Sequence, residues 1–278
     1  MENKISIFGS TGFIGSRFCN LFPEESFRIL RGDMSPKSRQ ILYFISTVHN
    51  YNVFTNPHLD IDTNLTVLID VLESCRRSKK DCEFNFISSW FVYGDTNLPA
   101  KETSPCYPKG FYSITKKCAE GIVESYCKTF NIPFRIIRLC NVYGYHDERA
   151  SKKKNALQYI VEKLKKDEPV DLYHGGEFIR DYMHVDDACR AIKLIMDNAS
   201  SVNEITNVGS GHPVIFKDLI DMAVKFTGST SQISHVPPPD FHKIVQVKDM
   251  YLDNRKLTSL GFKSQVDLES GIRQLCQT

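Results

Sequence analysis

Three glycines follow the first apolar run of the chain and precede its first helical stretch. Residues 4–8 read KISIF, residues 9–15 read GSTGFIG, and an amphipathic pattern follows. Glycines permit a tight turn here and let backbone N–H groups approach a pyrophosphate at the N-terminus of the helix. A glycine triplet in this strand-to-helix position indicates dinucleotide binding more specifically than the triplet alone. The predicted cofactor contacts in this loop are Gly9, Thr11, Gly12, Phe13, Ile14 and Gly15.

Short apolar runs alternate with longer helical patterns along the rest of the chain. Strands are predicted at 4–8, 27–30, 40–46, 83–89 and 134–142, and helices at 13–22, 62–76, 112–130, 155–166, 186–197 and 215–226. Strands that alternate with helices form a parallel sheet covered on both faces. The prediction is an α/β fold with a doubly wound, Rossmann-like parallel sheet in residues 1–150. Residues 151–278 are expected to form a smaller C-terminal lobe, mainly for substrate binding, with some segments returning to the first domain.

The composition argues against several classes of partner. The 278 residues carry a net charge of +2, which leaves no electrostatic footprint for nucleic acid or an anionic membrane. No apolar run is long enough to span a bilayer, and we expect no signal peptide before the first strand. The nine cysteines lack metal-binding spacing, which predicts no metal site and a reduced, cytoplasmic protein.

A tyrosine and a lysine stand four residues apart in FYSITKK, residues 111–117. Positions i and i+4 of a helix share a face, so Tyr112 and Lys116 can reach one site. A nearby ammonium favours the phenolate and would lower the pKa of Tyr112 into the range for proton transfer. Charged residues recur at the same spacing as far as Lys128, so they form a polar stripe along the helix. From the helix alone, a face exposed to solvent explains this stripe better than a catalytic site does. Together with the glycine loop, the pair is interpreted as catalytic.

Further motifs in the same order make the chain resemble one family. They are Ser88-Ser89 before Val92-Tyr93-Gly94, RLCNVYG at 138–144, RDYMHVDD at 180–187 and NVGSG at 207–211. With the GxxGxxG loop and Tyr112-x-x-x-Lys116, they resemble the extended short-chain dehydrogenase/reductases, more narrowly their nucleotide-sugar epimerase/dehydratase/reductase group. The resemblance covers nearly the whole chain. It implies that Ser89 stabilises charge on a substrate oxygen, Tyr112 transfers the proton, and Lys116 tunes Tyr112 and holds the nicotinamide ribose.

The resemblance also implies how a substrate is held. Arg180 matches the family arginine that contacts the substrate diphosphate, and Asn141 matches an asparagine that often does so. From the residues alone, Arg180 can instead form a structural ion pair with Asp181 or Asp186. His146 matches a histidine used for epimerisation in GDP-fucose synthase, but a polar loop residue or a substrate contact also fits. The expected partner is a nucleotide sugar, and related enzymes imply a homodimer.

The end of the second strand allows two interpretations of the cofactor. An acidic residue there hydrogen-bonds the adenosine ribose in NAD-binding members, and Asp33 stands at a suitable count from Gly15. If the apolar run ends at Leu30, Arg31 takes that position, and its guanidinium suits the 2′-phosphate of NADP. The point at which the apolar run ends is better evidence for the position of the cofactor-selecting residue than a count of residues from Gly15 across an irregular turn. The prediction is therefore NADP(H), bound with the help of Arg31, with NAD as the alternative.

The two residues after Ser89 separate the reactions of the group. Dehydratases that resemble this chain carry Asp-Glu there, whereas Trp90 and Phe91 have no capacity for proton transfer. Dehydration is therefore not expected. The predicted reaction is NADPH-dependent reduction of the C4 ketone of a nucleotide-linked 4-keto-6-deoxyhexose. Its product would be a deoxysugar nucleotide for surface polysaccharides such as lipopolysaccharide O-antigen. An NAD-dependent nucleotide-sugar 4-epimerase and a non-catalytic dinucleotide-binding regulator remain as alternatives.

Overall fold

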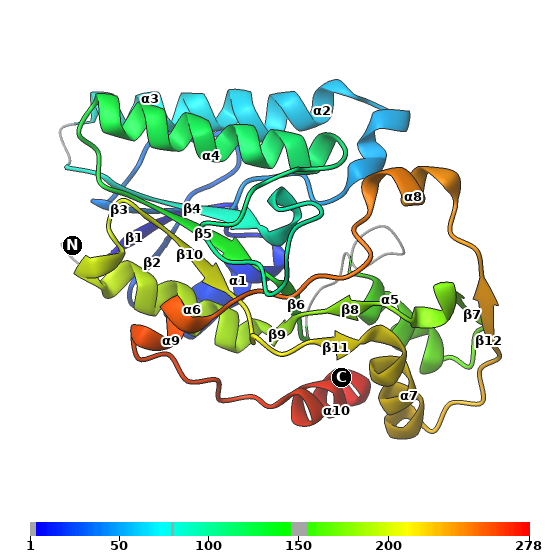
Figure 1. The fold of residues 1–278 in the computed structure, drawn as a ribbon. Coiled ribbons are helices and arrows are strands. Elements are labelled where there is room, and N and C mark those ends of the chain that lie inside the picture. The colour runs from blue at the N-terminus through cyan, green and yellow to red at the C-terminus, as the bar shows by residue number, and fades with distance from the viewer. Residues whose placement is uncertain (1–3, 79–80, 146–154) are drawn as a thin grey trace.

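A six-stranded parallel sheet forms the centre of the molecule, in the order β10-β5-β4-β3-β1-β2 (Figure 1). The computed structural model describes residues 4–78, 81–145 and 155–278. The strands of the sheet are β1 (Ile5–Phe8), β2 (Ser26–Arg28), β3 (Gln40–Tyr43), β4 (Glu83–Ser89), β5 (Phe134–Leu139) and β10 (Glu204–Val208). Every neighbouring pair in this sheet is parallel.

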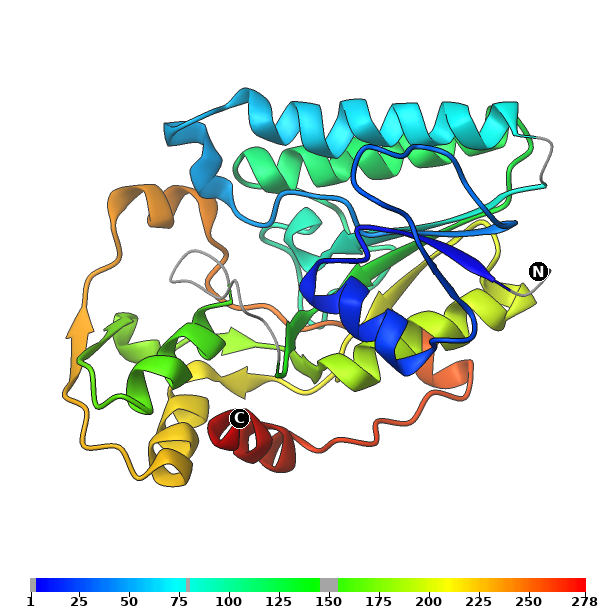
Figure 2. The same cartoon turned by 180° about the vertical axis from the view of Figure 1, so that it is seen from behind.

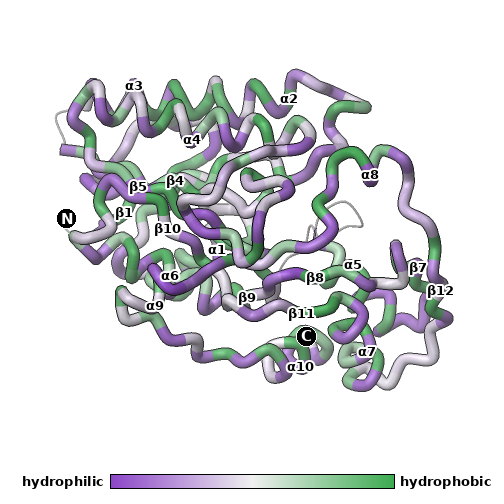
Figure 3. The backbone as a smooth tube through the Cα atoms, in the orientation of Figure 1, coloured by the Kyte–Doolittle hydropathy of each residue, from purple (hydrophilic) through white to green (hydrophobic). Residues whose placement is uncertain are grey.

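Helices cover both faces of the sheet. α1 (Phe13–Leu21) packs beside α6 (Val185–Asp197) on one face, and α3 (Val67–Arg77) lies beside α4 (Phe111–Thr129) on the other (Figures 1 and 2). Along β3, Leu42 joins the core under α1 and α6, whereas Ile41 and Tyr43 join the core under α3 and α4. Successive side chains of a strand point to opposite faces, so apolar strands bury both faces. Figure 3 shows the hydrophobic stretches gathered in these central strands. The predicted doubly wound α/β fold is confirmed.

The second half of the chain builds a smaller lobe beside the carboxyl ends of the strands (Figure 1). Its longer helices are α5 (Ala156–Leu164), α7 (Phe216–Thr227) and α10 (Leu268–Gln277), which share one apolar core. Its short strands pair as β6 (Asn141–Tyr143) with β9 (Tyr182–His184), β7 (Val170–Tyr173) with β12 (Ile233–Val236), and β8 (Ile179–Arg180) with β11 (Val214–Ile215). β10 belongs to the central sheet and α6 packs on one face of that sheet, so these two elements return to the first half of the fold. The predicted domain boundary near residue 150 stays a prediction.

Several short helices complete the fold. They are η1 (Asn50–Phe54), α2 (His58–Ile61), η2 (Asp62–Thr66), η3 (Trp90–Val92), η4 (His174–Gly176), η5 (Ala199–Ser201), α8 (Asp240–Val245) and α9 (Arg255–Ser259). Within the three described stretches, no helix has both the length and the apolar character needed to cross a membrane.

The second strand ends earlier than the sequence predicts. β2 stands at the edge of the sheet, pairs only with β1 and ends at Arg28. Ile29 is still buried, but Leu30 is 76% exposed. The prediction that the apolar run marks the strand's end at Leu30 is therefore wrong. The Ile29 N–H still donates to the Ile7 carbonyl at 3.1 Å and its side chain joins the core, whereas Leu30 has moved off the sheet into solvent.

Candidate functional site

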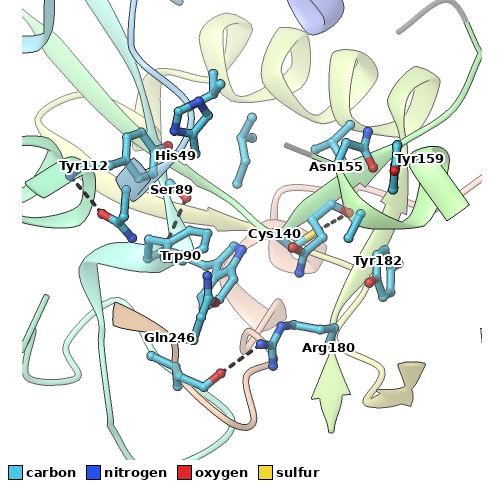
Figure 4. A pocket seen from close by; sticks show the side chains of 18 of the residues that line it. His49, Ser89, Trp90, Tyr112, Cys140, Asn155, Tyr159, Arg180, Tyr182 and Gln246 are labelled. Atoms are coloured by element: carbon cyan, nitrogen blue, oxygen red, sulfur yellow. Dashed lines mark hydrogen bonds between the residues drawn. The ribbon is translucent and has the colours of Figure 1, made fainter. Parts of the chain in front are cut away.

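A cavity of about 860 Å³ lies where the carboxyl ends of the strands face the C-terminal lobe. The cavity is lined by Gly9 after the end of β1, Ser89 at the end of β4 and Asn141 in the segment after β5. Tyr159 of α5 and Arg180 of β8 close the opposite side (Figure 4). Parallel strands bring their carboxyl ends to one edge of a sheet, which is where ligands of open α/β sheets bind.

The glycine loop has the geometry that a dinucleotide requires. Gly9 adopts a φ of +81°, and a Cβ at Gly15 would lie 2.4 Å from the Gly9 carbonyl oxygen. A side chain at either position would therefore disturb the turn. Gly12 is the N-cap of α1 and no side chain caps the helix, so its first N–H groups remain available to an anion. The predicted contacts Gly9, Gly12, Phe13, Ile14 and Gly15 line the cavity, whereas Thr11 is exposed outside its wall.

Tyr112 is buried beside the cavity near the start of α4. Its backbone N–H donates to Oδ1 of Asn50 at 3.0 Å. Burial raises the pKa of Tyr112 to about 12; a hydrogen bond with Ser89 opposes the shift and the Asp60 carboxylate adds to it. The expectation that Lys116 lowers this pKa is therefore wrong in this structure. Desolvation of the phenolate outweighs any nearby positive charge.

A pH titration would test the raised pKa of Tyr112. We expect wild type and the Tyr112→Phe variant to form the same number of phenolates at about pH 10, where an ordinary tyrosine is half ionised. The measurement is the difference in phenolate absorbance between the two proteins. One additional phenolate in the wild type below about pH 9 would contradict the raised pKa of Tyr112.

The side chain of Lys116 contacts the central sheet. Its Nζ donates to the Ile87 carbonyl at 2.7 Å and lies 4.6 Å from the centre of the Phe86 ring. Burial lowers the pKa of Lys116 to about 7, and the Glu120 carboxylate opposes the shift. Lys116 still lines the cavity, so its role in holding the nicotinamide ribose stays a prediction.

The two serines at the end of β4 have different partners. Ser89 accepts from the Phe91 N–H at 3.3 Å, which caps η3, and its hydroxyl lies beside Tyr112 (Figure 4). Ser88 donates to Oε1 of Glu120 at 2.7 Å, within a buried ion pair between Glu120 and Arg138. Adjacent strand residues face opposite sides of the sheet. This geometry agrees with the choice of Ser89 as the residue beside the reacting oxygen, although its catalytic role stays a prediction.

Arg180 enters the cavity as a cation without a carboxylate partner among the described residues. Its Nη1 donates to the Ile179 and Lys248 carbonyls at 2.7 and 2.5 Å, and its Nη2 donates to the Val247 carbonyl at 2.8 Å. The alternative ion pairs are not formed, since Asp181 accepts from Ser210 and Leu252 and Asp186 pairs with Arg17. Asn141 also lines the cavity and donates to the Asp181 carbonyl at 3.0 Å.

The two residues proposed to distinguish the cofactors lie outside the cavity wall. Arg31 is exposed and has no hydrogen-bond or ion-pair partner in the described parts of the chain. Oδ1 of Asp33 accepts from the Ser35 N–H at 2.8 Å, and its Oδ2 pairs with Lys37 at 3.0 Å. The carboxylate of Asp33 thus already has hydrogen-bond and ion-pair partners, whereas no partner of the Arg31 guanidinium is found among the described residues. His146 lies outside the described residues.

Sequence reasoning missed the segment after β3. Thr47, His49 and Asn50 line the cavity, and Figure 4 shows His49 close to Tyr112. Asn64, in the π-helical η2, anchors this segment by donating to the hydroxyls of Thr47 at 2.8 Å and Thr115 at 2.9 Å. A π-turn inside a helix often marks a functional site, but nothing in the local sequence signals it here.

Comparison with known proteins places this geometry in context. A sequence profile described as "NAD dependent epimerase/dehydratase family" matches residues 41–209, more than half of the chain. A putative UDP-glucose 4-epimerase of Methanocaldococcus jannaschii is 25% identical over 304 residues, covering 98% of this chain and 96% of that protein. The dTDP-glucose 4,6-dehydratase of Salmonella typhimurium is 26% identical over 264 residues, covering 84% of this chain and 70% of that enzyme.

Solved structures share the fold over almost the full length. The UDP-glucose 4-epimerase of Thermotoga maritima, solved with UDP-glucose, matches with a TM-score of 0.88 at 21% identity, covering 99% of this chain and 97% of that one. The UDP-glucose 4-epimerase of Thermus thermophilus, solved with NAD, matches with a TM-score of 0.85 at 22% identity, covering 99% and 98%. At these identities the similarity concerns the fold.

Proposed function

The chain belongs to the NAD dependent epimerase/dehydratase family, and we propose that it is a nucleotide-sugar 4-epimerase that uses a bound NAD. One observation carries the proposal: Ser89, Tyr112 and Lys116 share a cavity with the glycine loop, whereas Trp90 and Phe91 replace the proton-transferring pair of a dehydratase. Similar proteins that match nearly the whole chain include 4-epimerases. The epimerase therefore replaces the 4-keto reductase as the main interpretation.

The residues present fit a dinucleotide. Gly9 and Gly15 keep the first turn free of side chains, and the uncapped N-terminus of α1 offers N–H groups to a pyrophosphate. Lys116 lines the cavity and would reach the ribose hydroxyls by rotation away from the Ile87 carbonyl. A bound NAD would supply the oxidation and the subsequent reduction at C4 of the sugar.

The chain's own residues would move the proton and hold the substrate. Tyr112 would accept the proton of the C4 hydroxyl during oxidation and return it during reduction. Ser89, whose hydroxyl lies beside Tyr112, would hold the same oxygen. Arg180 would bind the diphosphate, because it is a buried guanidinium that forms no ion pair with a carboxylate among the described residues. Asn141 lies nearby in the same wall and would add a second polar contact.

Two measurements on the purified protein would test the proposal. We expect NAD to be released in stoichiometric amount when the protein is denatured. We also expect UDP-glucose and UDP-galactose to interconvert without net change in NADH absorbance. Stoichiometric consumption of NADPH on addition of a nucleotide 4-keto sugar, without interconversion, would contradict the 4-epimerase.

A second candidate is the NADPH-dependent 4-keto reductase, which one observation favours. Arg31 is exposed and unoccupied after β2, whereas Asp33 is held by Ser35 and Lys37. For this candidate, Arg31→Ala would raise the KM for NADPH by about tenfold or more and leave the KM for NADH unchanged. Equal effects on the two cofactors would contradict a phosphate contact by Arg31.

We also propose that the protein is a homodimer that packs through α4. The outward face of this helix carries apolar or small residues at helical spacing: Phe111, Ile114, Cys118, Gly121 and Ser125. Ile114 is 45% exposed. A Cβ at Gly121 would meet nothing within 4 Å, and a glycine within a helix costs about 1 kcal/mol relative to alanine. A small residue here would allow the same helix of a second copy to approach closely.

Ile114→Asp is expected to convert the dimer into a monomer. A carboxylate buried between two apolar helices would be desolvated without a partner. The measurement is the mass in solution from size-exclusion chromatography with light scattering. Ile244→Asp is the matched control, because Ile244 is 69% exposed but lies on α8. A dimer that survives Ile114→Asp, or a monomeric wild type, would contradict the proposed interface.

A further inference from the structure

A fully buried carboxylate packs beside the helix that carries Tyr112. Asp60 is 0% exposed and lies on α2, which packs against α4. Its Oδ1 accepts from Nδ2 of Asn52 at 3.0 Å and from the hydroxyl of Thr47, whereas its Oδ2 has no hydrogen-bond partner among the described residues. No lysine, arginine or histidine of the described chain pairs with it. Burying a carboxylate without a cation is costly, so a role beyond packing is expected.

Asp60 is connected to the backbone of Tyr112 by two hydrogen-bonded routes. In the first route, the Thr47 hydroxyl donates to Asp60 and accepts from Nδ2 of Asn64 at 2.8 Å. Nδ2 of Asn64 also donates to the Thr115 hydroxyl at 2.9 Å, and this hydroxyl donates to the Tyr112 carbonyl at 3.1 Å. These side chains are buried or partly buried, and a buried polar network holds its members in fixed positions.

The second route passes through η1. Asn52 donates to Asp60, and Asn50, on the same short helix, accepts from the Tyr112 N–H at 3.0 Å. The N-cap residue of α4 is Gly110, which has no side chain to cap the helix. Asn50 therefore supplies the cap from a segment that is distant in the sequence. The start of α4, with Tyr112, is thus fastened to the segment that Asp60 anchors.

We propose that Asp60 is a positioning residue for Tyr112 whose buried negative charge keeps the transferred proton on the tyrosine hydroxyl between the two halves of the reaction. This inference rests on the proposed function. Tyr112 takes one proton from the C4 hydroxyl of the sugar during oxidation and gives one back during reduction. A nearby carboxylate disfavours the phenolate, so the proton stays on Tyr112 while the ketone is present. Burial is the main cause of the raised pKa of Tyr112, the hydrogen bond with Ser89 opposes it, and the Asp60 carboxylate adds to it.

Other polar side chains of the described chain near Tyr112 bring no negative charge. On α4, Nζ of Lys116 donates to a backbone carbonyl of β4, and Ser89 at the end of β4 offers a hydroxyl. η1 contributes Tyr51, and its N-cap is His49, whose Nδ1 accepts from the Tyr51 N–H at 3.2 Å. Ammonium, hydroxyl, phenol and imidazole groups are cationic or neutral in their usual forms.

The elements packed against α4 also hold acidic and basic side chains that are exposed or ion-paired: His58, Asp62, Asp70, Glu73, Glu83 and Arg138. The arginines that pair with Glu73 and Glu83 complete this set. Exposed charges are screened by water, and paired charges largely cancel. On these elements, Asp60 is therefore the acidic side chain that is buried and has no cation among the described residues. A negative charge that acts on Tyr112 can be assigned to it.

Asp60→Asn separates the charge of Asp60 from its hydrogen bonds, because the amide oxygen can still accept from Asn52 and Thr47. We expect the midpoint of the Tyr112 titration to fall by about one pH unit, which gives about tenfold more phenolate at any pH well below the midpoint. The measurement is the difference in phenolate absorbance between Asp60→Asn and the same protein with Tyr112→Phe. Circular dichroism at each pH shows whether the protein is folded. Asp62→Asn is the matched control, because Asp62 is exposed two residues away and should leave the midpoint unchanged.

The pH dependence of turnover gives a second readout closer to neutral pH. Proton uptake from the C4 hydroxyl needs the phenolate form of Tyr112, so turnover falls on the acidic side of its titration. For the interconversion of UDP-glucose and UDP-galactose, Asp60→Asn should move this acidic limb to lower pH by about one pH unit. A role of Asp60 in folding alone would lower the melting temperature of the variant and leave the position of the limb unchanged.

The same Tyr112 midpoint and the same acidic limb in wild type and Asp60→Asn would overturn the proposal, because the hydrogen bonds of Asp60 would then explain its burial. An equal shift in Asp62→Asn would also overturn it, since any lost carboxylate would have the same effect. Asp60→Ser, which is smaller and also uncharged, takes the place of Asp60→Asn if that variant does not fold. A wild type that does not interconvert the two sugars contradicts the proposed function, and the phenolate titration still decides whether the charge of Asp60 acts on Tyr112.

Discussion

Tyr112→Phe is expected to reduce turnover by about 10²–10⁴-fold, the usual contribution of general acid–base catalysis. The variant loses only the hydroxyl oxygen beside Ser89, and the ring keeps its edge contact with Phe91. The fold and the bound NAD that the proposed function implies should therefore be unaffected. The measurements are the turnover number with UDP-glucose and the amount of NAD released on denaturation.

Tyr107→Phe is the control for this prediction. Tyr107 is 65% exposed and lies outside the cavity wall, so its hydroxyl should contribute nothing to turnover. If the Tyr112 variant keeps more than about a tenth of wild-type turnover, Tyr112 is not the principal proton-transfer group. If the variant releases no NAD, its loss of activity reports a failure of cofactor binding and the comparison must be made with added NAD.

Glu120→Gln is expected to have the largest effect on stability, a loss of about 3–5 kcal/mol in the free energy of unfolding. Oε1 of Glu120 accepts from Ser88 at 2.7 Å and from Nε of Arg138 at 2.8 Å, and its Oε2 accepts from Nη2 of Arg138 at 2.7 Å. Both side chains are almost fully buried. The substitution would leave the Arg138 guanidinium buried opposite a neutral amide. The measurement is urea denaturation at neutral pH.

Glu124→Gln on the same helix is the matched control. Glu124 pairs with Lys128 at 2.6 Å, but both side chains are exposed. Solvent screening and side-chain entropy leave such pairs worth only about 0.3–0.5 kcal/mol. Similar losses in the two variants would show that the buried pair does not contribute more than an exposed one, against this prediction. Glu120 also lies one helical turn from Lys116, so Glu120→Gln should lower the pKa of Lys116 further, since the Glu120 carboxylate now raises it.

Much of the site was predictable because its motifs are local. The conformation of residues 9–15 depends on glycines within that same stretch, so the loop and its place before α1 follow from sequence. The i to i+4 spacing likewise places Tyr112 and Lys116 on one helix. The residues that fix the backbone of Tyr112 and act on its pKa were not predictable in this way. Asn50 and Asp60 come from η1 and α2, and no pattern in their own segments marks them.

The sequence by itself determined the doubly wound sheet, the glycine loop and the set Ser89, Tyr112 and Lys116, because periodicity and short motifs act over a few neighbouring residues. Tertiary structure decided what those groups can do. Burial raises the pKa of Tyr112, contrary to expectation, and the ammonium of Lys116 donates to the Ile87 carbonyl. Packing at the sheet edge decided where β2 ends. Desolvation and packing depend on groups that are distant in the chain and adjacent in space, so no count along the sequence reports them.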